Sequence, residues 1–275
     1  MDILEHRKRG YSNIGNDGII KFILKTLGMS TGTFVEFGAY DGVKNSNCKK
    51  LQEKGWSGIF IEPDIERYEK LEQEYDSCKD KIVCINGKIE LHGDNLFDNI
   101  VDPYLEGRNI DFCSIDVDGL DLEIFETFEK YLPTVVCIEG GQALPPYHER
   151  VEKSVAQNAI QQSLQVMVNS FEEKGYKILC CYQDCFFVKK EFYSNFDVSE
   201  DLMTLYFNGL RSRPLCMSYV KEYMDAAGIK NEIVDYVLKK SDYSKYGYEN
   251  RHLWAVQQLK KILKALNKKE KLLKK

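Results

Sequence analysis

The sequence predicts a doubly wound α/β domain built on a mostly parallel, seven-stranded sheet. Apolar strand-like runs alternate with helical patterns along residues 33–190. These runs are apolar nearly throughout, as in strands that helices cover on both faces, whereas a strand with one wet face alternates apolar and polar residues. Two final runs, separated only by a tight link around Gln183 and Asp184, predict an antiparallel hairpin that closes the sheet.

Each element follows from its own stretch of sequence. The run TFVEFG at 33–38 is the first strand, and an amphipathic stretch through Leu51 follows it. A second strand at 58–62 precedes a helix at 64–75. The remaining strands are expected at 81–86, 110–116, 134–139, 176–181 and 185–190, with helices from residue 120 and over 154–174.

The chain divides into a core domain, 1–190, and a helical extension, 191–275, that is rich in Tyr and Lys. We expect the extension to close over a bound acceptor, to mediate a homodimer, or both. Arg211 and Arg213 are candidates for pairing with a phosphate or carboxylate on an acceptor, although two arginines in a loop are more often plain surface charge.

Composition excludes several classes of protein. The 275 residues are 43% hydrophobic and 29% charged, which is ordinary for a soluble globular protein, and the net charge of −5 gives no general attraction to nucleic acid. The start lacks the apolar core of a leader peptide, and no apolar run approaches the roughly 20 residues that span a bilayer. The nine cysteines are an odd number and lie mostly in strand-like runs, which favours a reducing, cytoplasmic location over disulfides or structural zinc.

The strongest chemical signal is VEFGAYDG, where Glu36, Gly38 and Gly42 follow the pattern E-x-G-x-x-x-G at the end of the first strand. Glycine lets the backbone turn sharply and approach a ligand closely. A dinucleotide site would show G-x-G-x-x-G instead. The neighbouring carboxylate suits a ligand with ammonium and sulfonium charge better than a phosphate, although an ordinary glycine turn is the simpler reading.

Glu62 ends the second strand, 20 residues after Gly42. An acidic side chain at this offset is suited to accept both ribose hydroxyls of a nucleoside. Asn86 and Gly87 follow the third strand, where they either border that nucleoside near its adenine or form an ordinary turn.

Five segments, taken in order, resemble the FkbM-type S-adenosylmethionine-dependent methyltransferases: GYSNIGNDGIIKFIL, FVEFGAYDGVKNSNCKKLQEKGWSGIFIEPD, IDFCSIDVDGLDLEIF, VVCIE and GYKILCCYQDCFFV. The resemblance covers roughly 10–190. It implies a class I, Rossmann-like methyltransferase fold, S-adenosylmethionine as cofactor, and methyl transfer to oxygen on a sugar or related acceptor in glycan biosynthesis. The residues that it places around the cofactor are Glu36, Gly38 and Asp41 at the methionine part, Ser46 and Asn47 nearby, and Glu62 at the ribose.

One part of the chain departs from that family. Relatives often carry S-Q-x-G-E-D near the start, whereas this chain has Asn13 in place of the glutamine and Asn16 in place of the glutamate, followed by Asp17. An amide instead of an acid makes a role of this segment in acceptor binding less certain.

Three carboxylates follow the fourth and fifth strands: Asp116 and Asp118 in IDVDG, and Glu139. Neighbouring strand ends bring them to the mouth of the site, where they would orient the cofactor's ammonium, act as general base, or hold magnesium. Asp118 and Gly119 are also suited to a turn and helix N-cap. Cofactor contact and capping are favoured over base and metal, so no metal is predicted and magnesium is the weaker alternative.

The candidate catalytic residues are Asp116, Glu139 and His148. His148 lies on the loop after the fifth strand, and histidine accepts a proton near neutral pH, but an exposed loop histidine is an equal reading. His92 is a weaker second choice.

The leading hypothesis is an S-adenosylmethionine-dependent O-methyltransferase with a small polar acceptor, a sugar or its activated or phosphorylated form. A metal-dependent glycosyltransferase that uses Asp116-Val117-Asp118 is the first alternative; it leaves the glycine turn and Glu62 unexplained. The second is a non-catalytic methyltransferase-fold module that works through its C-terminal helices.

Overall fold

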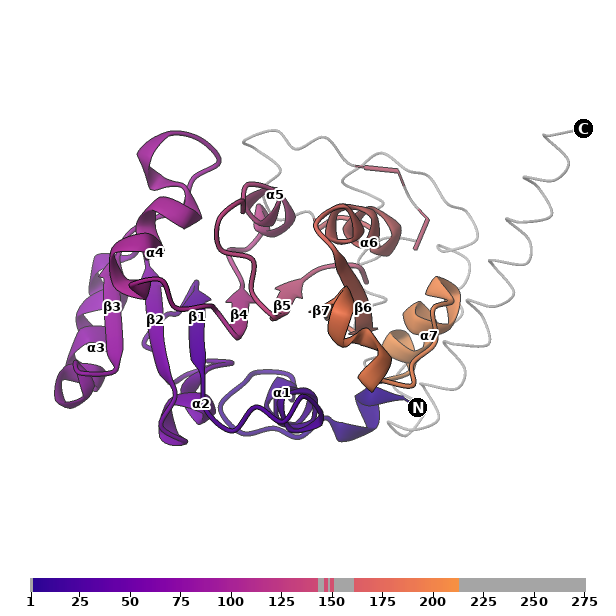
Figure 1. Cartoon of the computed structure of the whole chain (residues 1–275), viewed down its shortest axis with the longest axis horizontal. Coiled ribbons are helices and arrows are strands. Elements are labelled where there is room, and N and C mark those ends of the chain that lie inside the picture. The colour runs from indigo at the N-terminus through magenta and orange to yellow at the C-terminus, as the bar shows by residue number, and fades with distance from the viewer. Residues whose placement is uncertain (1, 143–145, 148, 151–160, 213–275) are drawn as a thin grey trace, which may run out of the picture.

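A computed structural model describes residues 2–142, 146–147, 149–150 and 161–212 of the chain. Its core is one seven-stranded sheet with the strand order β3-β2-β1-β4-β5-β7-β6 (Figure 1). The strands are β1 Thr33–Phe37, β2 Ser57–Glu62, β3 Ile82–Asn86, β4 Phe112–Ile115, β5 Val135–Glu139, β6 Tyr176–Cys181 and β7 Asp184–Lys189.

The first five strands are parallel, and β7 runs antiparallel to both β5 and β6. The predicted fold class is therefore confirmed: a doubly wound, mostly parallel sheet of the class I methyltransferase, Rossmann-like type. The closing hairpin is confirmed as well, with β7 inserted between β5 and β6. Because the chain leaves β1 toward β2 and β3 and returns on the other side to β4, the strand order reverses between β1 and β4. This is the place where open α/β sheets bind ligands, beyond the carboxyl ends of the strands.

Helices cover both faces of the sheet. Figure 1 shows α1 (Asn16–Thr26) and α2 (Lys49–Glu53) along one face, and α4 (Phe97–Leu105), α5 (Asp121–Glu126) and α6 (Leu164–Glu173) along the other. The core accordingly consists of two buried clusters, one on each side of the sheet.

Strand β1 shows how sequence alternation assigns side chains to the two layers. Phe34 packs in the cluster beneath α1 and α2, while Val35 and Phe37 pack in the cluster beneath α4 and α5. Successive side chains of a strand point to opposite faces, so Glu36 points to the same face as Phe34. An ionisable group is thereby placed inside an apolar layer, at the carboxyl end of the central strand.

Two helices differ from the predictions. The pattern over 154–174 predicted one long helix, but α6 begins only at Leu164, because Ser163 is its N-cap and accepts from the Val166 N–H at 3.4 Å. Residues 161–163 precede the helix, and 154–160 lie outside the described residues. Helix α4 was not predicted. It contains Pro103, which weakens a helical pattern even though the helix buries Phe97 and Val101.

Helix α3 (Ile65–Tyr75) matches its prediction and begins beside the site. Asp64 is its N-cap and accepts from the Arg67 N–H at 3.0 Å. Pro63 cannot donate a backbone hydrogen bond, which separates the end of β2 from the start of this helix. The helix therefore starts directly after Glu62.

Beyond residue 190 the described chain contains a short 3-10 helix (Lys190–Asn195) and α7 (Leu202–Ser212), with residues 196–201 between them in no helix. Leu205 and Tyr206 of α7 are buried in the core cluster that also contains α6. Residues 213–275 lie outside the described part, and so does the expected role of most of the extension. Among the described helices, none combines the length and apolar character that a membrane span requires.

Candidate functional site

A cavity of about 530 Å³ lies at the carboxyl ends of the parallel strands, at the predicted position. Its volume falls within the range of small-molecule sites. The wall includes the following polar residues and glycines: Asn13, Glu36, Gly38, Tyr40, Lys44, Ser46, Glu62, Arg67, Gly87, Lys88, Asp116, Asp118, Glu139 and Gln183.

Gly38 joins the two sides of this cavity. Its φ is +74°, a left-handed conformation that favours glycine, and a Cβ at this position would overlap with the carbonyl oxygen of Asp116. The ends of β1 and β4 are therefore in backbone contact. Any larger residue would push the two strand ends apart and reshape the cavity wall.

Gly42 and Asp41 shape the loop after β1 from behind the wall. A Cβ on Gly42 would stand 2.5 Å from Tyr75 Cε2, so this glycine permits close packing against α3 and does not border the cavity. The Asp41 carboxylate accepts from the backbone N–H groups of Val43 and Lys44 at 3.0 and 2.7 Å. The structure thus gives both residues a loop-forming position, whereas the sequence predicted ligand contact.

Glu36 borders the cavity but directs its carboxylate to the loop that follows. The carboxylate accepts from Ser46 Oγ at 2.6 Å, from the Asn47 N–H at 2.7 Å and from the Cys48 N–H at 3.3 Å. Burial raises the pKa of Glu36 to about 7, against the opposing effect of these hydrogen bonds. Its main contact is therefore with residues 46–48, and of these Ser46 reaches the cavity wall.

Asn47 belongs to a buried polar network behind that wall. Its Nδ2 donates to Ser114 Oγ at 2.9 Å, and its Oδ1 accepts from Asn16 Nδ2 at 3.0 Å. Asn16 also donates to Asp184 and accepts from the Tyr182 hydroxyl. The network links α1, the loop after β1, β4 and β7, so Asn47 supports the site and does not line it.

This network explains the amide at position 16. A carboxylate there would face the Asp184 carboxylate, whereas an amide donates to it and to Asn47. Asp17 holds the preceding segment by accepting from the Gly10 N–H at 3.0 Å and the Ser12 N–H at 2.8 Å. This fold of the segment brings Asn13 to the cavity wall, a contribution that the sequence left uncertain.

Glu62 lies on the wall at the end of β2 and is 2% exposed. One carboxylate oxygen accepts from the Tyr40 N–H at 2.7 Å and the other from the Asp64 N–H at 3.0 Å. Each carboxylate oxygen can accept a further hydrogen bond, so the group is fixed in place and still able to bind two donors. Gly87 lies on the wall beside it, whereas Asn86 donates to the Glu62 and Pro63 carbonyl oxygens and ties β3 to β2.

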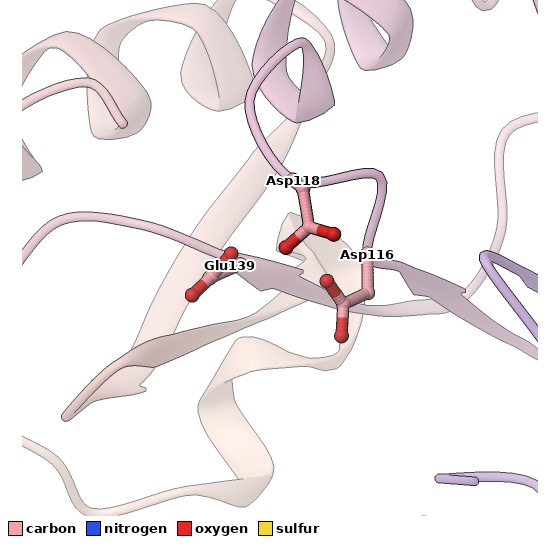
Figure 2. A group of neighbouring side chains, drawn as sticks. All are labelled: Asp116, Asp118 and Glu139. Carbon is pink, nitrogen blue, oxygen red and sulfur yellow. The ribbon is translucent and has the colours of Figure 1, made fainter. Parts of the chain in front are cut away.

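Asp116, Asp118 and Glu139 form the acidic cluster at the other end of the cavity (Figure 2). One carboxylate oxygen of each lies within 4.8 Å of the others. Both oxygens of Glu139 are held by side-chain amides, from Gln183 at 2.9 Å and Gln161 at 3.1 Å. No described residue donates a hydrogen bond to the Asp116 side chain, which faces the cavity.

The electrostatics of the acidic cluster favour bound protons or a bound cation. The Asp116 side chain is exposed to the open cavity, but the protein around it restricts its contact with bulk water and so raises its pKa to about 9, and the charges of Asp184 and Glu139 add to this effect. Burial, followed by the charge of Asp184, raises the pKa of Glu139 to about 7. The cluster is able to bind an ammonium, a sulfonium or a divalent cation, or to accept a proton from a hydroxyl.

The alternative in which Asp118 caps the following helix is wrong. Helix α5 begins after Leu120, and its first turn is held by Asp121, whose oxygens accept from the Val117 N–H at 2.9 Å and the Gly119 N–H at 2.8 Å. Asp118 has a φ of +57°, and its carboxylate turns toward Asp116 (Figure 2).

The sequence missed the cationic part of the site. Lys44, Arg67 and Lys88 all line the cavity, and Arg67 and Lys44 lie 4.7 and 5.5 Å from the centre of the Tyr40 ring. Lys44 lies in a segment that carries the family resemblance, but no role was predicted for it, and Arg67 and Lys88 lie outside those segments. Only the fold brings the three cations to one cavity wall. The one signal in the sequence is their position: each follows the carboxyl end of a predicted strand within a few residues, where ligands of such sheets bind.

Several predicted residues remain apart from the described site. His148 and Arg213 lie outside the described residues, and nothing is described of the Arg211 side chain. His92 is exposed at the start of a short 3-10 helix and is not part of the cavity wall.

No protein-family model and no curated protein matches this chain. Among solved structures, it is similar to M. capricolum TrmK in complex with S-adenosylhomocysteine, with 10% identity, a TM-score of 0.45, and coverage of 88% of this chain and 96% of that one. It is similar to Podospora anserina methyltransferase PaMTH1 bound to S-adenosylhomocysteine, with 11% identity, 65% and 79% coverage and a TM-score of 0.45. It is also similar to a SAM-dependent methyltransferase from Aquifex aeolicus, with 13% identity, coverage of 61% of this chain and 86% of that one, and a TM-score of 0.37. Likenesses this distant do not decide the activity, and the strand order itself is the evidence for the fold.

Proposed function

We propose that this protein is an S-adenosylmethionine-dependent methyltransferase of the FkbM type. The observation that carries the proposal is a cavity at the reversal of strand order with the Gly38 turn in its middle and carboxylates at both ends, Glu62 on β2 and the acidic cluster on β4 and β5. The methyl donor has matching parts: ribose hydroxyls at one end, and ammonium and sulfonium charge at the other.

The order of the strands suggests how the donor lies. Glu62 would accept from the ribose hydroxyls, and the adenine would lie against Gly87, because both residues belong to the wall at the β2 and β3 end. The methionine part would then lie against Gly38 and Asp116, where the strand ends touch. This arrangement leaves the wall at Asp118, Glu139 and Gln183 for the acceptor.

The bound donor supplies an electrophilic methyl group on a positively charged sulfur. In the proposed transfer the acceptor oxygen forms a bond to the methyl carbon as the carbon–sulfur bond breaks, with its electron pair staying on sulfur. Most of the acceleration in such a displacement comes from holding the reactants in line. Glu139 is the leading candidate to take the acceptor's proton, since its pKa of about 7 leaves it partly ionised near neutral pH. The pKa of Asp116, about 9, keeps that carboxyl protonated near neutral pH, so Asp116 takes the same role only where the positive charge of the bound donor ionises it.

The proposal also covers the methylated atom, the acceptor and the C-terminal extension. We propose oxygen as the methylated atom and a small polar, saccharide-like acceptor in glycan biosynthesis, in a cytoplasmic protein. The extension, 191–275, is proposed to act as acceptor lid or dimer contact. His148 is retained as a candidate base on the loop after β5.

Calorimetric titration of the full chain with S-adenosylhomocysteine tests the proposal. We expect saturable one-to-one binding and, with an acceptor panel, methyl transfer from S-adenosylmethionine. Folded protein that gives no heat of binding at millimolar ligand would refute the assignment.

One observation favours a second candidate function, a metal-dependent glycosyltransferase: three carboxylates with oxygens within 4.8 Å of one another. Hard oxygen ligands suit manganese or magnesium, which in turn bind a nucleotide-sugar diphosphate. UDP-glucose binding that requires manganese, together with no binding of S-adenosylhomocysteine, would reverse the ranking.

A further inference from the structure

The cationic side chains of the cavity wall are separated along the sheet from the acidic cluster. Lys88 follows β3, Arg67 lies on α3 directly after β2, and Lys44 lies in the loop after β1. The acidic cluster follows β4 and β5. Because the strands are ordered β3-β2-β1-β4-β5, the cations occupy one end of the cavity and the acidic cluster occupies the other.

The two ends also differ in how their polar groups are satisfied. At the cationic end, Glu62 is held by two backbone N–H groups, and Lys44 and Arg67 lie over Tyr40. At the acidic end, Glu139 is held by two carboxamides, while the Asp116 side chain receives no hydrogen bond from a described residue. The acidic end therefore offers acceptor atoms in excess, and it lacks a cationic side chain among the described wall residues.

The position of the acceptor follows from the proposed function, on which this inference rests. Adenosine at Glu62 and Gly87, with methionine at Gly38 and Asp116, leaves the β5 side of the wall open. The reacting atom of the acceptor then lies against Asp118, Glu139 and Gln183. The donor brings one net positive charge to this end, from its ammonium, sulfonium and carboxylate. That charge lowers the pKa values of Asp116 and Glu139, which are raised in the empty cavity, and so favours their ionised forms. One positive charge does not balance three carboxylates, so this end keeps a negative excess.

We propose that the reacting end of the acceptor is an uncharged polyol or an amino-alcohol, with no phosphate or carboxylate next to the accepting atom. Hydroxyl and ammonium groups donate hydrogen bonds to the carboxylates. A phosphate in the same place would lose its hydration and face carboxylates at short range, and like charges at a binding surface oppose association strongly. The inference removes phosphorylated small sugars from the acceptors that the sequence suggested.

Matched acceptor pairs test this inference on the full chain. Binding of S-adenosylhomocysteine is measured first; its absence counts against the proposed function itself. With binding established, transfer of labelled methyl from S-adenosylmethionine is compared for glucose and glucose 6-phosphate, glucose and glucose 1-phosphate, and glucosamine and glucosamine 6-phosphate. We expect methyl transfer to at least one unphosphorylated acceptor. The kcat/KM for its phosphorylated partner should be lower by at least about tenfold. Equal or faster transfer to a phosphorylated member, or silence of every unphosphorylated member, overturns the inference.

A charge-removing variant supplies the second readout. Asp118→Asn keeps the side-chain size and removes one carboxylate, so the ratio of phosphorylated to unphosphorylated kcat/KM is expected to rise at least about threefold. Asp94→Asn is the matched control, because Asp94 is exposed in a short 3-10 helix and is not part of the cavity wall. Its ratio is expected to equal that of the wild type. A ratio unchanged in Asp118→Asn, in protein that melts as the wild type does, contradicts the assigned charge discrimination.

Discussion

Gly38 and Asp116 are packed backbone to backbone, so closely that a Cβ on Gly38 would overlap with the Asp116 carbonyl oxygen. The ladder between β1 and β4 runs up to this contact, where the Asp116 N–H donates to the Phe37 carbonyl oxygen at 3.3 Å. The contact places an acid of the acidic cluster beside the glycine turn. The position of Asp116 in the cavity therefore depends on the absence of a side chain at residue 38.

Gly38→Ala is expected to weaken both folding and cofactor binding. Gly28 offers a matched control, since its φ of +72° resembles the +74° of Gly38 while a Cβ there would meet no atom within 4 Å. Gly28→Ala should cost only the left-handed backbone, about 1–2 kcal/mol of unfolding free energy. Gly38→Ala should cost at least about 1 kcal/mol more, because the end of β4 must move. Urea denaturation and calorimetry with S-adenosylhomocysteine measure the two effects. Equal losses in both variants would show that the contact is unimportant.

Removing the Glu62 side chain is expected to weaken binding of S-adenosylhomocysteine. Glu62→Ala removes the acceptor for two ribose hydroxyls and frees the N–H groups of Tyr40 and Asp64. We expect a loss of about 1.5–3 kcal/mol in binding free energy, the scale of hydrogen bonds to a charged group. Glu66→Ala, one turn away on the exposed side of α3, is the control and should bind as the wild type does. Wild-type affinity in Glu62→Ala would remove this residue from the site.

The raised carboxyl pKa values predict a stability that falls with rising pH. Burial raises the pKa values of Glu36 and Glu139 to about 7. The pKa of Asp116, which is exposed to the open cavity, is raised to about 9 by restricted contact with bulk water and by the neighbouring carboxylates. An unfolded carboxyl group has a pKa of about 4. At pH values between this pKa and the raised native pKa, the native state binds more protons than the unfolded state, so the unfolding free energy declines as pH rises. The contribution of Asp116 is present at low pH and is lost as pH rises through about 9.

Asp116→Asn isolates that contribution. The amide does not titrate, so the decline in unfolding free energy between pH 6 and 9 should be shallower than in the wild type. Urea denaturation at constant ionic strength measures the slope, and Asp94→Asn, exposed and away from the cavity, should keep the wild-type slope. Parallel pH profiles for wild type and Asp116→Asn would mean that Asp116 is ionised in the native protein throughout this range.

The sequence predicted the sheet and the location of the cavity because those depend on local patterns. Buried strands such as β1 are apolar runs, and the glycine at residue 38 and the acid at residue 62 mark strand ends in the chain itself. The sequence did not predict in which direction the individual side chains of a motif point. Gly42 packs on α3 and Asp41 folds the loop, although both stand in the same motif as Gly38. Which residue of a turn faces the ligand is set by packing from distant segments.

The residues that the sequence missed have their partners far along the chain. Asn16 donates a hydrogen bond to Asp184, 168 residues further along the chain, and Gln183 donates one to Glu139, 44 residues before it. Arg67 and Lys88 are single cations that come to the same cavity wall only when β2 and β3 pair. No periodicity or spacing encodes such contacts, whereas the strand-end rule narrows the search to the loops that carry them.

The network around Asn16 yields a last prediction, on the coupling between the N-terminal segment and the site. Asn16→Ala leaves the carboxylate of Asp184, the amide of Asn47 and the hydroxyl of Tyr182 each without one of its partners. Unsatisfied buried polar groups cost about 1–3 kcal/mol each, so we expect a loss of at least about 2 kcal/mol in unfolding free energy. Asn99→Ala is the control, because Asn99 is exposed and makes only a 3.5 Å hydrogen bond to the Gly93 carbonyl oxygen.

A variant with an acid at this position separates packing from charge. Asn16→Asp keeps the size and the acceptor for Tyr182, but it replaces the donor to Asp184 by a second carboxylate. Like charges at this distance disfavour the native state, so Asn16→Asp should be less stable than the wild type at pH 8 and recover as the pair takes up a proton at lower pH. Urea denaturation at pH 5.5 and 8 measures the recovery. If Asn16→Asp is as stable as the wild type at pH 8, the segment is held by Asp17 alone, and the amide at residue 16 has no part in fixing Asp184.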